Sequence, residues 1–261
     1  MRSLFAAAAV VASLATLADA KPKHHTAKPT KSARAITATK PARGKHITTA
    51  PAAYVIRGDV EGKQSLGLPW HGKLHDPIAL PPGDGYVIRR PYRAFGTQTT
   101  VDFVHAALLD MREQFPDTHV LAVGDISQED GGRITQHRSH QSGRDVDIGL
   151  VYKEKPATFP EDFIKGTADN LDCEATYALL NEFAETAPND GGAQMIFLDY
   201  NVQGLLYNWA KEHGEDETIL AHLFQYPNRN NSTAMVRHWP NHDNHMHVRF
   251  KCPKSDTRCS N

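Results

Sequence analysis

The sequence has few long apolar segments. The only extended one spans residues 4–17, follows Arg2 and precedes Ala18-Asp19-Ala20. It is shorter than the roughly 18 apolar residues that read as a membrane span. A short apolar run with a basic start and a small-x-small end is typical of a secretory signal peptide. We therefore predict a cleavable signal peptide at residues 1–20 and no transmembrane segment.

Cysteine is scarce, with only Cys173, Cys252 and Cys259, and no C-x-x-C pair occurs. This spacing argues against cysteine as a zinc ligand. In an oxidising compartment Cys252 and Cys259 could close a small loop, but the residues alone leave a pairing of Cys173 with either one open.

Acidic residues are missing from residues 21–51, which contain eight Lys or Arg residues among Thr, Ala and Pro. Such a segment buries too little apolar surface to fold, so it is predicted to be a disordered basic tail or linker. Without these eight residues, Arg2 and Asp19, the chain keeps 20 basic and 29 acidic residues. The tail could hold the protein near anionic material or be a plain solvated spacer. An exported location argues against nucleic acid as a partner.

Residues 52–261 are long enough for one domain with its own core, and no internal repeat is visible. Apolar runs predict strands at 86–88, 120–123, 146–152 and 195–198. Helical spacing predicts helices at 99–115, 175–184, 202–213 and 218–224. This irregular interleaving favours an α+β fold, with a small, mainly antiparallel sheet flanked by helices.

Histidine is abundant near the end of the chain, where residues 242–249 read as the final strand. Side chains two apart in a strand face the same side, so His245 and His247 should point together. Met246 and Val248 should face the core.

A second histidine block precedes and overlaps the strand at 146–152. It contains His137, His140, Asp145 and Asp147. Clustered imidazoles repel one another once protonated and need a shared cation or carboxylate. Two imidazoles and one carboxylate suit a catalytic zinc ion with a position open to water, so we expect a metallohydrolase site on the sheet face. An iron oxygenase uses the same ligand types but normally has His-x-Asp on one strand. Here the histidine and the aspartate, His140 and Asp147, are seven residues apart.

The two blocks resemble those of the penicillin-insensitive murein endopeptidases, zinc peptidases that share the small fold of lysostaphin, D-Ala-D-Ala peptidases and the hedgehog signalling domain. The resemblance runs from about Gly85 through Cys259. Three motifs carry it: His137-x-x-His140-x-x-Gly143 continuing to Asp145-Val146-Asp147, His242-x-x-His245-x-His247-Val248-Arg249, and Cys252-Pro253 followed by Cys259. The resemblance implies a Cys252–Cys259 disulfide, which leaves Cys173 free.

The resemblance also implies roles for the site residues. The ligands of one zinc ion per chain would be His140, Asp147 and His247. His245 would act as general base on the attacking water, and His137 would stabilise the oxyanion or support the ligands. Asp145 would orient His137 or a ligand histidine, and His242 and Arg249 would support the site or bind substrate. The arginines that could clamp a substrate carboxylate are Arg133, Arg138, Arg144 and Arg249.

The function implied by the resemblance is a periplasmic zinc endopeptidase that hydrolyses D-alanyl-diaminopimelate cross-links of peptidoglycan. A D,D-carboxypeptidase or an L,D-peptidase on the same fold is the alternative within the class. A further alternative, outside the enzymes, is a non-catalytic zinc-containing protein that binds the cell wall. The presence of His137 and His245 in addition to the ligands disfavours it.

Overall fold

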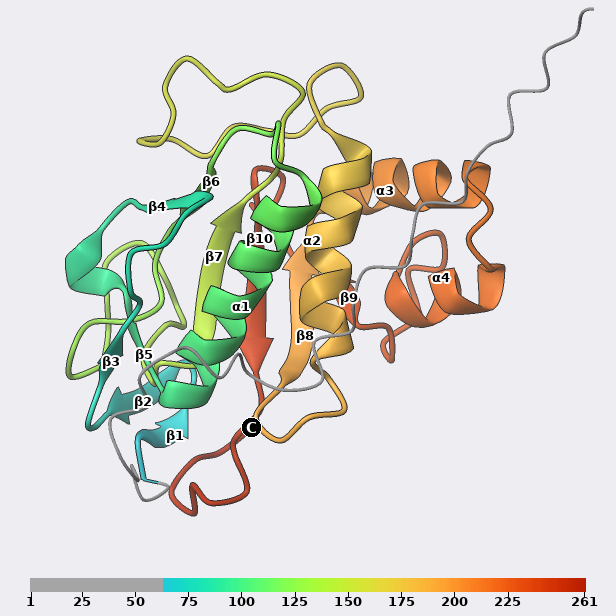
Figure 1. Ribbon diagram of the computed structural model, residues 1–261. Coiled ribbons are helices and arrows are strands. Elements are labelled where there is room, and N and C mark those ends of the chain that lie inside the picture. The colour runs from blue at the N-terminus through green and yellow to red at the C-terminus, as the bar shows by residue number, and fades with distance from the viewer. Residues whose placement is uncertain (1–62) are drawn as a thin grey trace, which may run out of the picture. The chain divides into compact units, whose positions relative to one another are not determined.

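The computed structural model describes residues 63–261 (Figure 1). The predicted signal peptide, the predicted basic tail and the first residues of the predicted domain lie outside the described residues. Within residues 63–261, no helix combines the length and the apolar composition needed to cross a membrane.

A six-stranded sheet forms the centre of the described region, in the order β4, β6, β7, β10, β8, β9. Its strands are β4 (Tyr86–Ile88), β6 (Leu121–Val123), β7 (Asp145–Gly149), β10 (His245–Phe250), β8 (Ala193–Leu198) and β9 (Val236–His238). The three central pairs are antiparallel, whereas β4 with β6 and β8 with β9 are parallel.

The predicted α+β class is confirmed, but the sheet is mixed, since two of its five strand pairs are parallel. The reason lies in the connections. A helix lies between β4 and β6, and two helices lie between β8 and β9, and such crossovers return the chain in its original direction. Strand β9 is only three residues long and has no pattern in the sequence that predicts it, so the parallel edge was not predicted.

Helices α1 (Gln98–Gln114) and α2 (Cys173–Glu185) cover one face of the sheet, as Figure 1 shows, and α3 (Tyr200–Glu212) and α4 (Glu217–Leu223) lie toward its β9 edge. The predicted apolar stripe of α1 is confirmed, because Val101, Val104, Leu108 and Met111 are at most 2% exposed. The Thr97 side chain caps α1 by accepting from Thr100 N at 3.2 Å.

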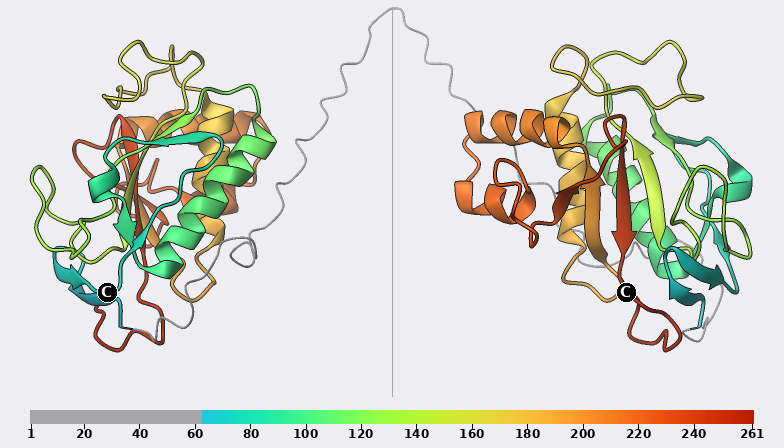
Figure 2. Two further views of the ribbon diagram at one scale, coloured as in Figure 1. Left: turned by 60° about the vertical axis from the view of Figure 1, so that its left-hand side comes forward. Right: turned by 180° about the vertical axis from the view of Figure 1, so that it is seen from behind.

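The other face of the central strands is turned toward the viewer in the right-hand view of Figure 2, where loops flank it. Met246 and Val248 of β10 are fully buried in the core, as predicted. The alternate positions lie on this other face, and the register of β10 with β7 places His247 opposite Asp147 and Arg249 opposite Asp145. Cross-strand pairing therefore brings together residues about a hundred positions apart.

Four short strands form two small antiparallel sheets of two strands each. They are β1 (Ser65–Leu68) with β2 (His71–Leu74), and β3 (Ile78–Ala79) with β5 (Phe95–Gly96).

The C-terminal segment packs beside β1 and contains the Cys252–Cys259 disulfide that the resemblance implied; Cys173 is free and half-buried. Arg144 is fully buried and donates to Ser65 Oγ at 2.9 Å, Phe250 O at 3.0 Å and Ser260 O at 2.6 Å. Arg144 therefore joins the loop before β7 to the C-terminal segment, and its burial excludes it as a substrate clamp.

Candidate metal centre

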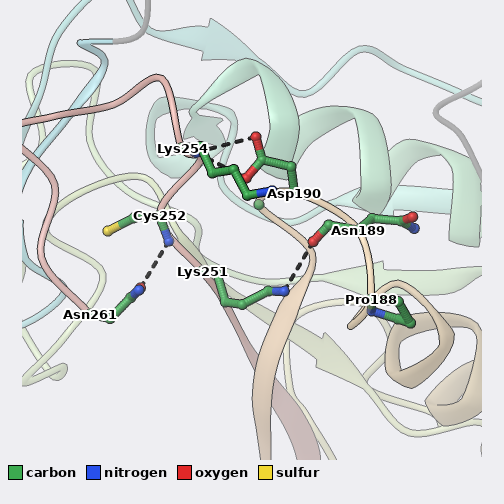
Figure 3. Close-up of a pocket in the computed structure, with 8 residues that line it drawn as sticks. Pro188, Asn189, Asp190, Lys251, Cys252, Lys254 and Asn261 are labelled. Atoms are coloured by element: carbon green, nitrogen blue, oxygen red, sulfur yellow. Dashed lines mark hydrogen bonds between the residues drawn. The ribbon is translucent and has the colours of Figure 1, made fainter.

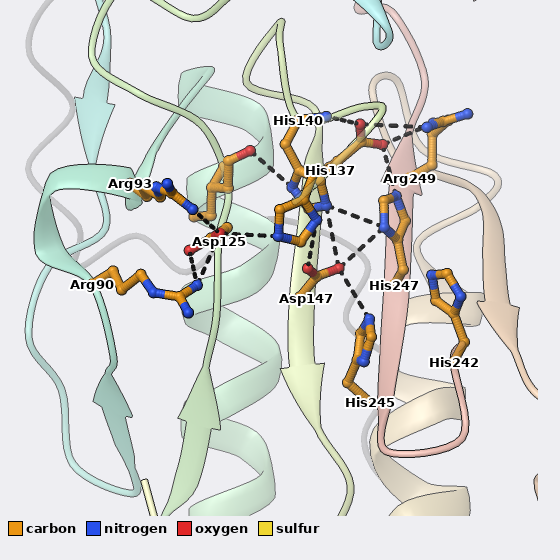
Figure 4. A network of polar contacts seen from close by, with 12 residues as sticks. Arg90, Arg93, Asp125, His137, His140, Asp147, His242, His245, His247 and Arg249 are labelled. Atoms are coloured by element: carbon orange, nitrogen blue, oxygen red, sulfur yellow. Dashed lines mark hydrogen bonds and ion pairs between the residues drawn. The ribbon is translucent and has the colours of Figure 1, made fainter. Parts of the chain in front are cut away.

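The Asp147 carboxylate lies at the centre of the histidine cluster (Figure 4). Its Oδ1 is 3.0 Å from His247 Nδ1, 3.3 Å from His140 Nε2 and 3.6 Å from His245 Nε2. Yet Oδ1 is buried and receives no hydrogen bond of acceptable geometry from the described residues. A buried carboxylate oxygen surrounded by imidazole nitrogens in this way calls for a positive partner that all of them share.

Three of these atoms form a nearly equilateral triangle. His140 Nε2 lies 3.2 Å from His247 Nδ1, and the distances from these atoms to Asp147 Oδ1 are 3.3 and 3.0 Å. Ligand atoms of a tetrahedral zinc site, with bonds of about 2.0–2.1 Å, lie about 3.4 Å apart. The three side chains therefore fit a single metal ion without large rearrangement.

Neighbouring groups hold both imidazoles in the orientation that this triangle needs. His140 Nδ1 lies 3.1 Å from the carbonyl oxygen of Ile126, which leaves Nε2 facing Asp147. His247 Nε2 lies 3.1 Å from Asp145 Oδ1, within ion-pair distance but outside hydrogen-bond geometry, which leaves Nδ1 facing the same point. Metal-binding histidines usually have such a partner on the second ring nitrogen.

Asp145 connects several parts of the cluster. It accepts from Arg249 Nε at 2.7 Å and from the His140 backbone N at 2.9 Å, besides its contact with His247. The resemblance implied that Asp145 orients either His137 or a ligand histidine. The structure places the ligand candidate His247 next to Asp145, and not His137.

Charge differs sharply among the buried groups. Burial would raise the pKa of Asp145 and of Asp147, but Arg249 for Asp145 and His140 for Asp147 hold these pKa values well below their usual range. Burial would lower the pKa of His247, but the Asp145 and Asp147 carboxylates outweigh it and raise this pKa to about 9.

His245 lies in a more apolar position than His247. Burial lowers the pKa of His245 to about 4, so the imidazole is neutral at pH 7. Its Nδ1 lies 2.6 Å from Asn244 Oδ1, an acceptor, so Nδ1 carries the proton and Nε2 faces Asp147 unprotonated.

Phe163 creates this apolar position. Its ring stacks on His245 with ring centres 5.2 Å apart. Gly124 and Gly149 make room for Phe163, since a Cβ at either glycine would lie 3.0–3.1 Å from the ring. The Arg89 guanidinium lies 4.1 Å from the centre of the same ring. Phe163 was not predicted from the sequence, because it stands in the irregular segment between β7 and α2.

His137 lies on the other side of Asp147. Its Nδ1 is 3.6 Å from Asp147 Oδ2, and its Nε2 is 3.1 Å from Asp125 Oδ2. His137, His140 and Asp147 also form a group whose ligand atoms lie within 4.8 Å of one another. His137 is thus an alternative candidate for a metal ligand, although its Nε2 already contacts Asp125.

Asp125 and its two arginine partners were not predicted from the sequence. Asp125 is 1% exposed and contacts Arg90 and Arg93 as well as His137. One signal was available: Asp125 directly follows the predicted strand at 120–123 and Gly124, at the end of a buried strand.

His242 and Arg249 lie at the β8 side of the cluster. The His242 ring centre is 4.8 Å from that of His245 and 5.7 Å from that of His247, and burial lowers the pKa of His242. The Arg249 guanidinium lies between aromatic rings, 5.3 Å from Phe197 and 5.4 Å from Trp70. Since Arg249 also binds Asp145, its charge is largely engaged within the protein.

The pocket drawn in Figure 3 lies elsewhere, next to Cys252 at the C-terminal disulfide. Lys251 Nζ donates to Ala187 O at 2.6 Å and to Asn189 O at 3.0 Å. The charge of Lys251 is thereby engaged, and no histidine lines this pocket. The histidine cluster is therefore the better candidate for chemistry.

The fold and the cluster define an α+β protein with a histidine and aspartate site able to hold a metal ion. Residues 65–172 match the family model described as penicillin-insensitive murein endopeptidase. This range includes His137, His140, Asp145 and Asp147.

Curated relatives extend the similarity along the chain. The penicillin-insensitive murein endopeptidase of Haemophilus influenzae is 29% identical over 215 residues, which cover 77% of this chain and 68% of the relative. That of Yersinia enterocolitica is 28% identical over 195 residues, covering 70% and 63%, and that of Pectobacterium atrosepticum 28% over 207 residues, covering 75% and 67%. The chain thus spans less than two thirds of the Yersinia relative. The resemblance to the penicillin-insensitive murein endopeptidases, predicted from the histidine motifs, is confirmed.

Proposed function

We propose that this protein is a zinc-dependent endopeptidase of the periplasm that hydrolyses the D-alanyl-diaminopimelate cross-links of peptidoglycan. The observation that carries the metal-dependent part is the triangle of His140 Nε2, Asp147 Oδ1 and His247 Nδ1, with sides of 3.0–3.3 Å. The choice of bond rests on the similarity to the murein endopeptidases.

In this proposal His140, Asp147 and His247 are the ligands of one zinc ion. His137 is left out because its Nε2 is directed to Asp125 and the three ligand atoms already lie at a uniform spacing. Zinc bound there would polarise the scissile carbonyl and activate a water molecule, so no serine or cysteine nucleophile is needed. An enzyme without such a nucleophile is not acylated by β-lactams.

The two remaining histidines divide the other tasks. His245 accepts a proton from the attacking water at Nε2 and delivers it to the leaving amine, because its Nδ1 is already protonated against Asn244. His137, on the other side of Asp147, supports the site through its contact with Asp125 and does not donate to the scissile carbonyl oxygen, because its Nε2 is directed to Asp125.

The domain organisation completes the proposal. Residues 1–20 direct export, residues 21–51 form a basic tail that is dispensable for turnover, and residues 52–261 form the peptidase domain. The basic tail is suited to retention on an anionic polymer, and retention of this kind should weaken as salt is raised.

A single experiment tests the activity. The purified chain is incubated with isolated cross-linked muropeptides, with and without a chelator and after zinc is added back, and products are identified by mass. Conversion of cross-linked dimers to monomers, abolished by the chelator and restored by zinc, is expected. Loss of a single terminal alanine would instead indicate a carboxypeptidase, and stoichiometric zinc without any product would indicate a binding protein.

A further inference from the structure

Asp125 is a buried carboxylate with an unusually complete set of partners. Arg90 Nη1 lies 3.1 Å from each of its oxygens, and Arg93 Nη1 and His137 Nε2 lie 2.9 and 3.1 Å from Oδ2. The backbone fixes Asp125 as well, because Asp147 N donates to Asp125 O at 3.0 Å and Gly124 N donates to Asp147 O at 2.7 Å. Figure 4 shows Asp125 between the arginines and His137.

These contacts decide how His137 is presented to the site. A carboxylate only accepts hydrogen bonds, so the Nε2 of His137 must carry a proton to bind Asp125. The ring is then held with Nδ1 toward Asp147 Oδ2, at 3.6 Å. His137 stands in a loop, with its side chain 22% exposed, and needs such an anchor to keep one orientation.

We propose that Asp125, itself held by Arg90 and Arg93, is the positioning residue that fixes the ring of His137 at the metal centre. This inference deepens the proposed function and rests on it for its kinetic consequences. Carboxylates that orient a histidine near a metal commonly change activity by about 10–100-fold when they are replaced.

Asp125→Asn is the informative substitution. Arg93 and His137 share Oδ2 of Asp125, so the amide either turns its NH₂ group toward both of them or keeps an uncharged oxygen there, and in both cases the contact with His137 weakens. We expect kcat to fall by about 10–100-fold while bound zinc and KM stay near the wild-type values. Asp102→Asn is the matched control, since Asp102 is also buried but binds Gln98 on α1, and it should leave kcat unchanged.

A double variant separates positioning from a structural role. In the His137→Ala background, Asp125→Asn should cause no further loss of kcat beyond a few-fold, because the group that it positions is gone. Losses that multiply in the double variant would overturn the inference, and so would an Asp125→Asn variant with normal zinc content and normal kcat.

A spectroscopic measurement needs no activity. In the metal-free wild-type chain, ¹⁵N-labelled in histidine, the proton of neutral His137 should reside on Nε2, and in Asp125→Asn this preference for Nε2 should weaken. A proton on Nδ1 of the wild type would overturn the inference even if Asp125→Asn fails to fold. If the wild-type chain cleaves no muropeptide but the tautomer is as expected, the proposed function fails and the positioning contact stands.

Discussion

The two imidazoles at successive outward positions of β10 lie in contrasting surroundings. The start of the strand, at His245, is apolar and neutral, with Phe163 on the ring and the Asn244 amide on Nδ1. The middle of the strand, at His247, is flanked by two ionised carboxylates. The pKa of His245 falls to about 4, whereas that of His247 rises to about 9. Position on one strand face brings histidines together, but the neighbouring strand and loops decide what each can do.

The largest effect is expected at the middle of the strand. His247→Ala should lose most bound zinc, because three protein ligands become two, and hydrolysis of muropeptides should disappear with the metal. Metal analysis after dialysis, together with product analysis by mass, measures both. A fully metallated His247→Ala variant would remove His247 from the ligand set and favour His137 in its place.

At the start of the strand, a substitution should change the catalytic rate without changing the amount of bound zinc. His245→Ala should keep nearly stoichiometric zinc yet lose about 10²–10⁴-fold in kcat, the usual range for a general acid or base. Steady-state kinetics on soluble cross-linked muropeptides, with zinc quantified in the same samples, checks this. If His245→Ala also emptied the site, the contrast between the two positions would be wrong.

The same contrast should appear in the stability of the metal-free protein. His245 has a folded-state pKa below the unfolded value, so its contribution is present above about pH 6.5 and is lost as pH falls toward 4. His247 has a raised folded-state pKa, so its contribution is present below about pH 6.5 and is lost as pH rises toward 9.

Each shift corresponds to about 3 kcal/mol of unfolding free energy. Urea unfolding in chelator from pH 4 to 9 measures these contributions. His245→Ala should flatten the acid side of the profile and His247→Ala the alkaline side. Equal effects of both variants on both sides would contradict the assigned surroundings.

A smaller effect is expected at Phe163, which makes the start of the strand apolar. Phe163→Leu should keep zinc and reduce kcat by less than about tenfold, because the His245 ring loses its stacking partner and becomes more hydrated. The pKa of His245, followed by NMR in the metal-free chain, should move up toward its ordinary value. Phe159→Leu is the control, because Phe159 packs on His119 instead of His245.

Much of this arrangement could be predicted from the sequence because its signals are local. The helix at 99–115 and the strand at 120–123 follow from periodicity, and the like-facing pair His245 and His247 follows from the strand pattern. The motif spacing also brought His140, Asp145 and Asp147 together.

What could not be predicted depends on contacts distant in sequence. Phe163 has no periodic neighbours, and its place over Gly124 and Gly149 follows only from the folded chain. Asp125 is a single acidic residue after a strand, and nothing local links it to Arg90 or His137. Strand β9 is three residues long, so the parallel edge of the sheet was missed as well.

His140 is fully buried with φ at 64°, a left-handed conformation that costs a residue with a Cβ about 1–2 kcal/mol and glycine much less. Glycine is therefore the replacement that this backbone accepts best, and His140→Gly should unfold at a higher urea concentration than His140→Ala. The glycine variant would also leave an imidazole-shaped void beside the Ile126 carbonyl oxygen. Free imidazole added to that variant could occupy the void and supply the missing nitrogen, which would turn a covalent ligand into a diffusible one and make zinc retention and turnover depend on imidazole concentration.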